Sequence, residues 1–193
     1  MVIGEKIKEF EQNKEHTYLL GFEESYGYLV GTYARDKDGV VATMLITEMA
    51  AWYKTKGMTL YEGLMSLYEK YGTHREKLVS VELEGIEGLE KISKIMSDVR
   101  EKTPTEIGDK KVLFLNDYKS GVKTNILNKE EEEIKLPKSN VLLFKMEDNC
   151  WCAVRPSGTE PKIKFYMGAS GRSVDEAENV LKKMWEDLER YTK

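Results

Sequence analysis

The sequence predicts an incomplete α/β unit followed by an α+β domain, in which helices cover one face of an antiparallel sheet. In residues 1–72, one buried strand pattern accompanies three helical patterns, which is too little sheet for a complete α/β domain. From about residue 73, the expected order is one strand, one helix, four strands and one helix, with hairpins between strands. The length of 193 residues allows one or two domains.

In the first part, residues 17–22 (TYLLGF) are typical of a short buried strand, and helices are expected near 3–15, over 39–56 and over 60–71. Asp38 is a candidate N-cap and Gly57 a helix stop. Thr59 and Glu62 form a capping-box pattern. The apolar positions with helical spacing in the second helix are Val41, Met44, Leu45 and Met49. In the third helix, a buried stripe is expected at Leu60, Leu64, Leu67 and Tyr71.

In the second part, strands are expected over 77–85, 110–118 and 162–169, and a hairpin over 140–155 that turns at 147–149. Helices are expected over 88–104 and after the capping-box pattern of Ser173 and Glu176. The side chains expected to face inward from these helices are Leu89, Ile92, Ile95, Met96 and Val99, then Val174, Ala177, Val180, Leu181, Met184, Trp185 and Leu188. Residues 119–139 are expected to form a long irregular loop.

Composition narrows the function classes. A net charge of −4 and a pI near 5.5 argue against broad nucleic-acid binding, and the acidic block at 129–135 is expected to be a solvated loop. The sequence has no apolar run long enough to span a membrane. Its start lacks the apolar core of a secretory signal, so a cytoplasmic protein is expected. Cys150 and Cys152 are expected to be reduced, partly buried thiols.

The segment RPSGTEPK, residues 155–162, carries more hydrogen-bonding groups than a strand reversal needs. Arg155 offers a planar fork that can meet two phosphate oxygens, and Ser157 and Thr159 offer hydroxyl donors. Gly158 can take a positive φ and let backbone N–H groups converge on an anion. Lys162 adds positive charge at the rim. The alternative from residue types alone is a rigid hairpin whose Arg155 makes a structural ion pair.

This segment strongly resembles the C-terminal phosphate-binding loop of the α-D-phosphohexomutases, the phosphoglucomutase and phosphomannomutase family. The resemblance implies that Arg155, Ser157, Gly158 and Thr159 hold the phosphate group that is not transferred, with Lys162 a weaker match. A second stretch, GFEESYGYLVG at residues 21–31, resembles the family's sugar-binding loop. It implies that Glu23 and Ser25 contact sugar hydroxyls. The segment RDKDG, residues 35–39, implies that Lys37 reaches the substrate; a solvated lysine beside a helix N-cap is the alternative.

The resemblance implies that residues 1–72 are the latter part of the family's third domain, an α/β remnant, and that residues 73–193 are its fourth domain. The family's reaction requires a phosphoserine loop and a magnesium-binding loop, and neither pattern occurs in this sequence. No catalytic residue and no metal ligand is therefore assigned, and the isolated chain is expected to be inactive. Mg²⁺ and glucose 1,6-bisphosphate are implied for the full-length enzyme.

The partners implied by the resemblance are a hexose phosphate substrate and the N-terminal domains of the same enzyme, with no nucleic acid and no membrane. Two alternatives belong to other classes. One is a free-standing phosphosugar-binding or regulatory module. The other is a sheet-based nucleic-acid binder that uses Lys164 and Tyr166 on one strand face, which the net acidity disfavours.

Overall fold

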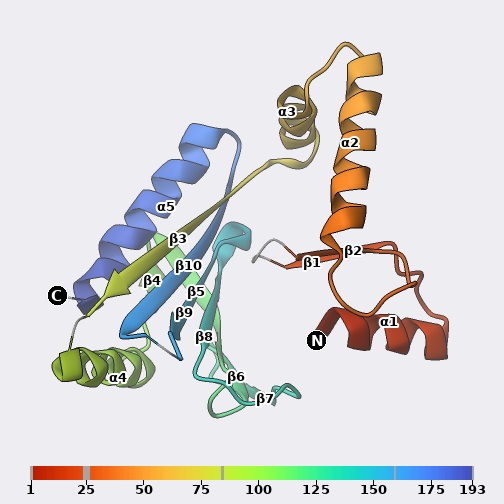
Figure 1. Cartoon of the computed structure of the whole chain (residues 1–193). Helices are drawn as coiled ribbons and strands as arrows, with labels where there is room; N and C mark the ends of the chain where they lie inside the picture. Colours follow the sequence, from red (N-terminus) through yellow and green to blue (C-terminus); the bar gives the residue numbers. More distant parts are fainter. Residues whose placement is uncertain (1, 24–26, 84, 159, 193) are drawn as a thin grey trace. The chain divides into compact units, whose positions relative to one another are not determined.

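The computed structural model describes residues 2–23, 27–83, 85–158 and 160–192. The chain divides into two compact units, Met1–Leu67 and Tyr68–Lys193. Figure 1 shows the elements of both units. No helix in the described ranges combines the length and the apolar character that a membrane span requires.

The first unit is a short hairpin with three helices. Its elements are α1 Val2–Asn13, β1 Leu20–Glu23, β2 Gly27–Val30, α2 Gly39–Thr55 and α3 Leu60–Tyr71, the last of which continues into the second unit. Strands β1 and β2 pair antiparallel, with Leu20 opposite Val30 and Glu23 opposite Gly27. The second strand was not predicted. It has only four residues, begins with Gly27 and is followed by Gly31, so its alternation is too short to distinguish from a loop.

The predicted helix boundaries in this unit are confirmed by their caps. Asp38 accepts hydrogen bonds from the backbone N–H groups of Val40 and Val41, at 2.8 and 3.1 Å. The Thr59 hydroxyl accepts from the Glu62 N–H at 3.2 Å, and the Glu62 carboxylate accepts from the Thr59 N–H at 2.6 Å. These side chains satisfy donors that a helix start otherwise leaves unpaired.

The apolar faces of α2 and α3 are exposed. Met44 and Met49 of α2 are 63% and 43% exposed, and Leu64 and Leu67 of α3 are 41% and 44% exposed. The prediction of a buried stripe on α3 is therefore wrong in this structure. An amphipathic pattern shows which face of a helix favours an apolar partner, and the small hairpin of this unit does not provide one.

The second unit is an antiparallel sheet in the order β3-β10-β9-β8-β5-β6-β7, with β4 paired to β5. The strands are β3 Thr73–Glu82, β4 Glu106–Ile107, β5 Lys110–Asp117, β6 Val122–Asn125, β7 Glu131–Glu133, β8 Leu142–Met146, β9 Trp151–Pro156 and β10 Lys162–Gly171. The helices are α4 Gly85–Glu101 and α5 Val174–Glu189, with single 3₁₀ turns η1 Glu147–Asn149 and η2 Arg190–Thr192. The predicted hairpin turn at 147–149 is confirmed.

The segment 119–139 is not the irregular loop that was expected, because β6 and β7 extend the sheet through it. The acidic block contains β7, whose residues are all exposed at the sheet edge. Glutamate has low strand propensity, so local sequence does not indicate this strand. Lys123 of β6 pairs with Glu132 of β7 at 2.9 Å, and a charged edge strand resists pairing with other chains.

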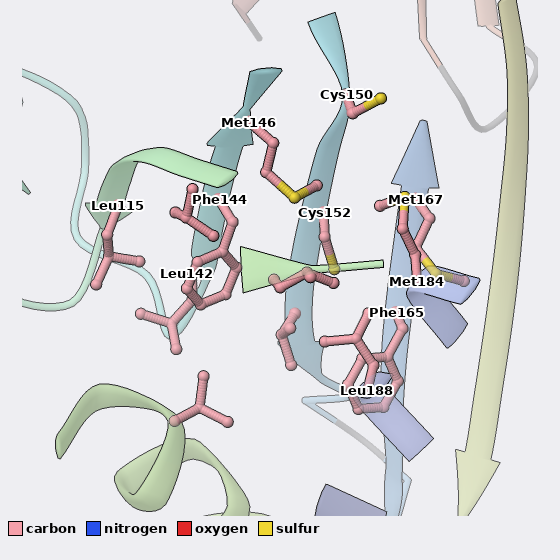
Figure 2. Close-up of a cluster of buried hydrophobic side chains, with 14 of the residues drawn as sticks. Leu115, Leu142, Phe144, Met146, Cys150, Cys152, Phe165, Met167, Met184 and Leu188 are labelled. Carbon is pink, nitrogen blue, oxygen red and sulfur yellow. The ribbon is translucent and has the colours of Figure 1, made fainter. Parts of the chain in front are cut away.

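The core lies between one face of the sheet and the two helices (Figure 2). Ile163, Phe165 and Met167 of β10 are fully buried, whereas Lys164 and Tyr166 alternate with them and stay partly exposed. The helices add Ile92, Ile95, Met96 and Val99 from α4, and Leu181, Met184 and Leu188 from α5, to the same cluster. Both helices therefore cover one face, as predicted.

Two details differ from the expected pattern in the second unit. Leu89, at the start of α4, is 55% exposed rather than buried. At the start of α5, the Ser173 hydroxyl accepts from the Glu176 N–H at 3.2 Å as expected, but the Glu176 carboxylate accepts from the N–H of Arg172 at 2.7 Å. The carboxylate therefore satisfies a donor one residue before the N-cap.

Both cysteines are free thiols in the core. Cys150 is 2% exposed and Cys152 is fully buried, so they are more buried than was expected. Desolvation by burial raises the pKa of the Cys152 thiol, which keeps it protonated and unreactive in the folded protein.

Candidate functional site

The predicted sugar-binding residues Glu23 and Lys37 lie together in the first unit. Glu23 ends β1, and the Lys37 ammonium lies 3.3 Å from its Oε2 atom. Lys37 belongs to the segment after β2, and that segment is held against β2 by the hydrogen bond from the Asp38 N–H to the Tyr28 carbonyl, at 2.8 Å. Ser25 lies outside the described residues.

Gly27 makes room for Lys37 to reach Glu23. A Cβ atom at this position would overlap the Cδ atom of the Lys37 side chain. The small cavity beside the pair is lined by Ile3, Glu23, Leu29, Arg35, Asp36 and Lys37 and has a volume of about 10 Å³. That space accommodates about one water molecule rather than a sugar ring. In this unit the pair therefore stands at the surface beside the hairpin.

The predicted phosphate loop connects β9 to β10 and is held by backbone hydrogen bonds. The Ser157 N–H donates to the Lys162 carbonyl and the Lys162 N–H donates to the Glu160 carbonyl, both at 2.7 Å. The Leu83 N–H, just after β3, donates to the Pro161 carbonyl at 2.9 Å. These bonds hold Ser157 and Glu160 against the start of β10, and Pro161 against the residue that follows β3.

A groove of about 560 Å³ lies beside this loop. It is lined by Ser139, Asn140, Val141, Arg155, Pro156, Ser157 and Gly158. The volume falls within the usual range for small-molecule sites. The structure therefore brings Arg155, Ser157 and Gly158 of the predicted phosphate site onto one surface, whereas Thr159 lies outside the described residues.

Lys162 is not among the residues that line this groove. Its ammonium lies 3.3 Å from the Glu160 carboxylate and 3.6 Å from the Glu82 carboxylate. The hydrogen bond and charge of Glu160, followed by the charge of Glu82, raise the pKa of Lys162. Glu160 thus pairs with this lysine and is not among the residues that line the groove.

The φ of Gly158 lies outside the left-handed range, which differs from the positive φ that was expected. A Cβ atom at Gly158 would meet no atom within 4 Å. The loop conformation therefore does not require glycine. What glycine provides here is open space over the backbone at the groove surface, which lets a ligand approach closely.

Sequence reasoning did not place residues 139–141 beside the phosphate loop, although they line the same groove. These residues precede β8, at the point where the expected irregular loop over 119–139 meets the expected hairpin over 140–155. The Ser139 N–H donates to the Tyr118 carbonyl and the Tyr118 N–H donates to the Val141 carbonyl, both at 3.1 Å. The segment thus extends the pairing of β8 with β5. Since this pairing joins residues more than twenty positions apart, no local signal identifies it.

A metal site is not found among the described residues. No group of three or more His, Cys, Asp or Glu side chains there is placed to hold a metal ion. The donor set therefore does not fit the magnesium that the family resemblance implies for the full-length enzyme.

The chain matches two parts of one protein family. Residues 2–71 match "Phosphoglucomutase/phosphomannomutase, alpha/beta/alpha domain III", and residues 78–186 match "Phosphoglucomutase/phosphomannomutase, C-terminal domain". The break between the two matched ranges is close to the division between the two compact units.

Curated relatives are about three times as long as this chain. A phosphoglucomutase of Staphylococcus epidermidis is 40% identical over 156 residues, which is 81% of this chain and 28% of that protein. A phosphoglucomutase of Staphylococcus aureus is 36% identical over 182 residues, 94% of this chain and 32% of that protein. The chain therefore spans about a third of the length of the relatives that it matches.

A solved structure has the same fold. The exocytosis-sensitive phosphoprotein pp63/parafusin, a phosphoglucomutase from Paramecium in its open form, aligns with 97% of this chain and 33% of its own, at a TM-score of 0.60 and 16% identity. The two matched family ranges, which cover most of the sequence, place the chain in the phosphoglucomutase/phosphomannomutase family, in the region of domain III and the C-terminal domain.

Proposed function

We propose that this chain is the substrate-recognition portion of a phosphoglucomutase or phosphomannomutase, an enzyme that interconverts hexose 1-phosphate and hexose 6-phosphate. The observation that carries the proposal is the groove onto which Arg155, Ser157 and Gly158 converge. The ligand is a hexose phosphate, whose non-transferred phosphate group occupies this groove.

Each groove residue has a distinct part in holding the phosphate. Arg155 is exposed at the end of β9, and its planar guanidinium can donate to two phosphate oxygens at once. The Ser157 hydroxyl donates to a third oxygen. Gly158 leaves the backbone accessible, so that a phosphate can approach the main chain without meeting a side chain. Because Arg155 is exposed, the attraction weakens as salt increases.

The sugar hydroxyls are held by the residues of the first unit. The Glu23 carboxylate accepts hydrogen bonds from neighbouring hydroxyls, and Lys37 donates to a hydroxyl or a bridging oxygen. Ser25 adds a further contact. Because Lys37 and Glu23 are already 3.3 Å apart, a sugar that reaches them inserts its hydroxyls between charges that the protein has oriented in advance.

The remaining machinery of the reaction belongs to other domains of the same enzyme. Phosphoryl transfer relies on a positioned nucleophile and on a metal ion that neutralises developing charge. The relatives are about three times as long as this chain, which leaves room for both. The isolated chain is therefore expected to bind without turning over substrate, and activity is expected only with the N-terminal domains.

The proposal is tested by titrating the chain with glucose 1,6-bisphosphate and following two-dimensional NMR spectra at low and then moderate salt. Fast-exchange shifts are expected at residues 155–158, and Arg155→Ala is expected to abolish them. Arg75→Ala is the matched control, because Arg75 is also an arginine of this sheet, with a side chain that is 41% exposed and pairs with Glu178 at 2.9 Å, on a different strand from Arg155. This control removes the same charge and is expected to bind like the wild type.

Two outcomes contradict the proposal. If millimolar ligand produces no shifts in the wild-type chain, the groove is not a phosphate site in this chain. If Arg75→Ala and Arg155→Ala weaken binding equally, the attraction comes from overall charge rather than from the groove. A mutase assay after mixing with the N-terminal domains then tests whether recognition serves catalysis.

A further inference from the structure

The groove beside the phosphate loop has a second polar wall that the loop motif does not include. Asn140 lines the groove together with Arg155 and Ser157. Its backbone neighbours Ser139 and Val141 are held by the two hydrogen bonds to Tyr118. The position of Asn140 is thus set by the sheet itself, because β8 lies between β5 and β9 (Figure 1).

The side chain of Asn140 is oriented by an arginine from α4. The Arg100 Nη2 group donates to Asn140 Oδ1 at 2.6 Å. Because a guanidinium can only donate, the oxygen of the Asn140 amide must face Arg100. The Nδ2 group therefore points away from Arg100, and it donates to no acceptor among the described residues. Asn140 also lines the groove.

Arg100 is itself held in place. Its Nε and Nη2 groups donate to the two carboxylate oxygens of Asp117 at 3.1 and 3.3 Å, and its Nη1 group donates to the Met96 carbonyl at 3.2 Å. The side chains of Arg100 and Asp117 are only 20% and 16% exposed. Asp117 neutralises the guanidinium, so the contribution of Arg100 to the groove is geometric rather than a free positive charge.

We infer that Asn140 is an additional ligand-binding residue of this groove, which donates from Nδ2 to an oxygen of the bound phosphate, and that Arg100 is its positioning residue. The inference rests on the proposed function, because it assigns a second donor to the same phosphate site. The ligand then sits between a cationic wall at Arg155 and a neutral donor at Asn140. A neutral donor at this point favours an anion without adding a second charge that would attract any polyanion.

The test follows the side-chain amide resonance of Asn140 during the glucose 1,6-bisphosphate titration of this chain. The Asn140 Nδ2 signals are expected to shift with the same saturation curve as the backbone amide of Gly158. Asn140→Ala is expected to weaken binding about ten- to a hundredfold, as for loss of one hydrogen bond to a charged group. Asn140→Asp keeps the acceptor for Arg100 but replaces the donor with a negative charge, so a larger loss is expected.

Asn128→Asp is the matched control. Asn128 is exposed in the β6–β7 turn, and its Oδ1 accepts from the Glu130 N–H at 3.1 Å, a bond that aspartate can also accept. This variant changes the net charge by the same amount as Asn140→Asp and is expected to bind like the wild type. Equal weakening by the two variants would show a general charge effect and overturn the inference.

A double-mutant cycle tests the part assigned to Arg100. Lysine in its place can still pair with Asp117 but cannot also direct the Asn140 amide, so Arg100→Lys should weaken binding about as much as Asn140→Ala. The combined variant should lose nothing further, whereas independent structural effects would add.

The failures of the two proposals are distinguishable. If Arg155→Ala abolishes binding while Asn140→Ala and Asn140→Asp bind like the wild type, the phosphate site stands and the role of Asn140 is refuted. If the wild-type chain does not bind at all, both are refuted.

Discussion

Replacing Gly108 with alanine should destabilise the second unit strongly. Gly108 lies in the turn between β4 and β5 with φ +61°, and a Cβ atom there would lie 2.6 Å from the Met184 backbone nitrogen and 2.8 Å from its Cα. The turn cannot move away easily, because the Gly108 N–H donates to Asp187 of α5 at 2.8 Å. The substitution therefore forces the turn and the helix backbone apart.

The loss of unfolding free energy expected for Gly108→Ala has two parts. Alanine in a left-handed conformation costs about 1–2 kcal/mol, and about 0.4–1 kcal/mol is recovered from the stiffer unfolded chain. Overpacking against the α5 backbone adds about 1–3 kcal/mol. Gly121→Ala isolates the first part, because Gly121 has φ +81° and its nearest neighbours would be 3.9 Å from a Cβ atom.

Urea unfolding followed by circular dichroism measures the difference. Gly108→Ala should lose about 1–3 kcal/mol more than Gly121→Ala, which corresponds to about 1 M in the transition midpoint at an ordinary slope. Equal losses for the two variants would refute the reasoning, because they would show that the close approach of α5 to Gly108 contributes nothing.

Three further outcomes are expected. Burial by itself would raise the pKa of Asp117, but hydrogen bonds from Arg100 and other donors outweigh burial and lower the pKa. The stabilisation by Asp117 is therefore complete above the unfolded pKa of about 3.9 and is lost as pH falls through the lower folded pKa. Asp117→Asn should flatten the dependence of unfolding free energy on pH between about 5 and 3, and an unchanged slope would contradict this. Gly158→Ala should leave the urea midpoint unchanged but weaken binding of glucose 1,6-bisphosphate, and equal effects on both would show a structural role. Cys150 and Cys152 should react with a thiol reagent only after unfolding, since both are buried; rapid labelling of the native chain would disprove it.

Much of the fold could be predicted from local chemistry. The cap of α2 and the capping box of α3 appear where Asp38 and Thr59 predict them, because a cap satisfies donors within a few residues of itself. The alternation of Ile163, Phe165 and Met167 correctly predicts a strand with one buried face. The turn at 147–149 was also predicted correctly.

Part of the candidate site could also be predicted from the sequence. The grouping of Arg155, Ser157 and Gly158 on one loop follows from their adjacency in the sequence, and the groove beside them is consistent with that expectation. Their binding of phosphate stays a prediction until the titration is made. Sugar binding by Glu23 and Lys37 also stays a prediction. The fold brings these two side chains within 3.3 Å of each other, although fourteen positions separate them in the sequence.

By itself, the sequence determined the family, the order of most elements and the residues that carry the phosphate loop, because each of these depends on contiguous residues. Only the tertiary structure decided that Lys162 pairs with Glu82, that an acidic segment joins the sheet edge, and that Asn140 lines the groove and accepts a hydrogen bond from Arg100. These features depend on strand pairing and on helix packing between distant segments. A charge or an amide in the sequence shows what it can bind, whereas its partner is chosen by the elements that the fold brings beside it.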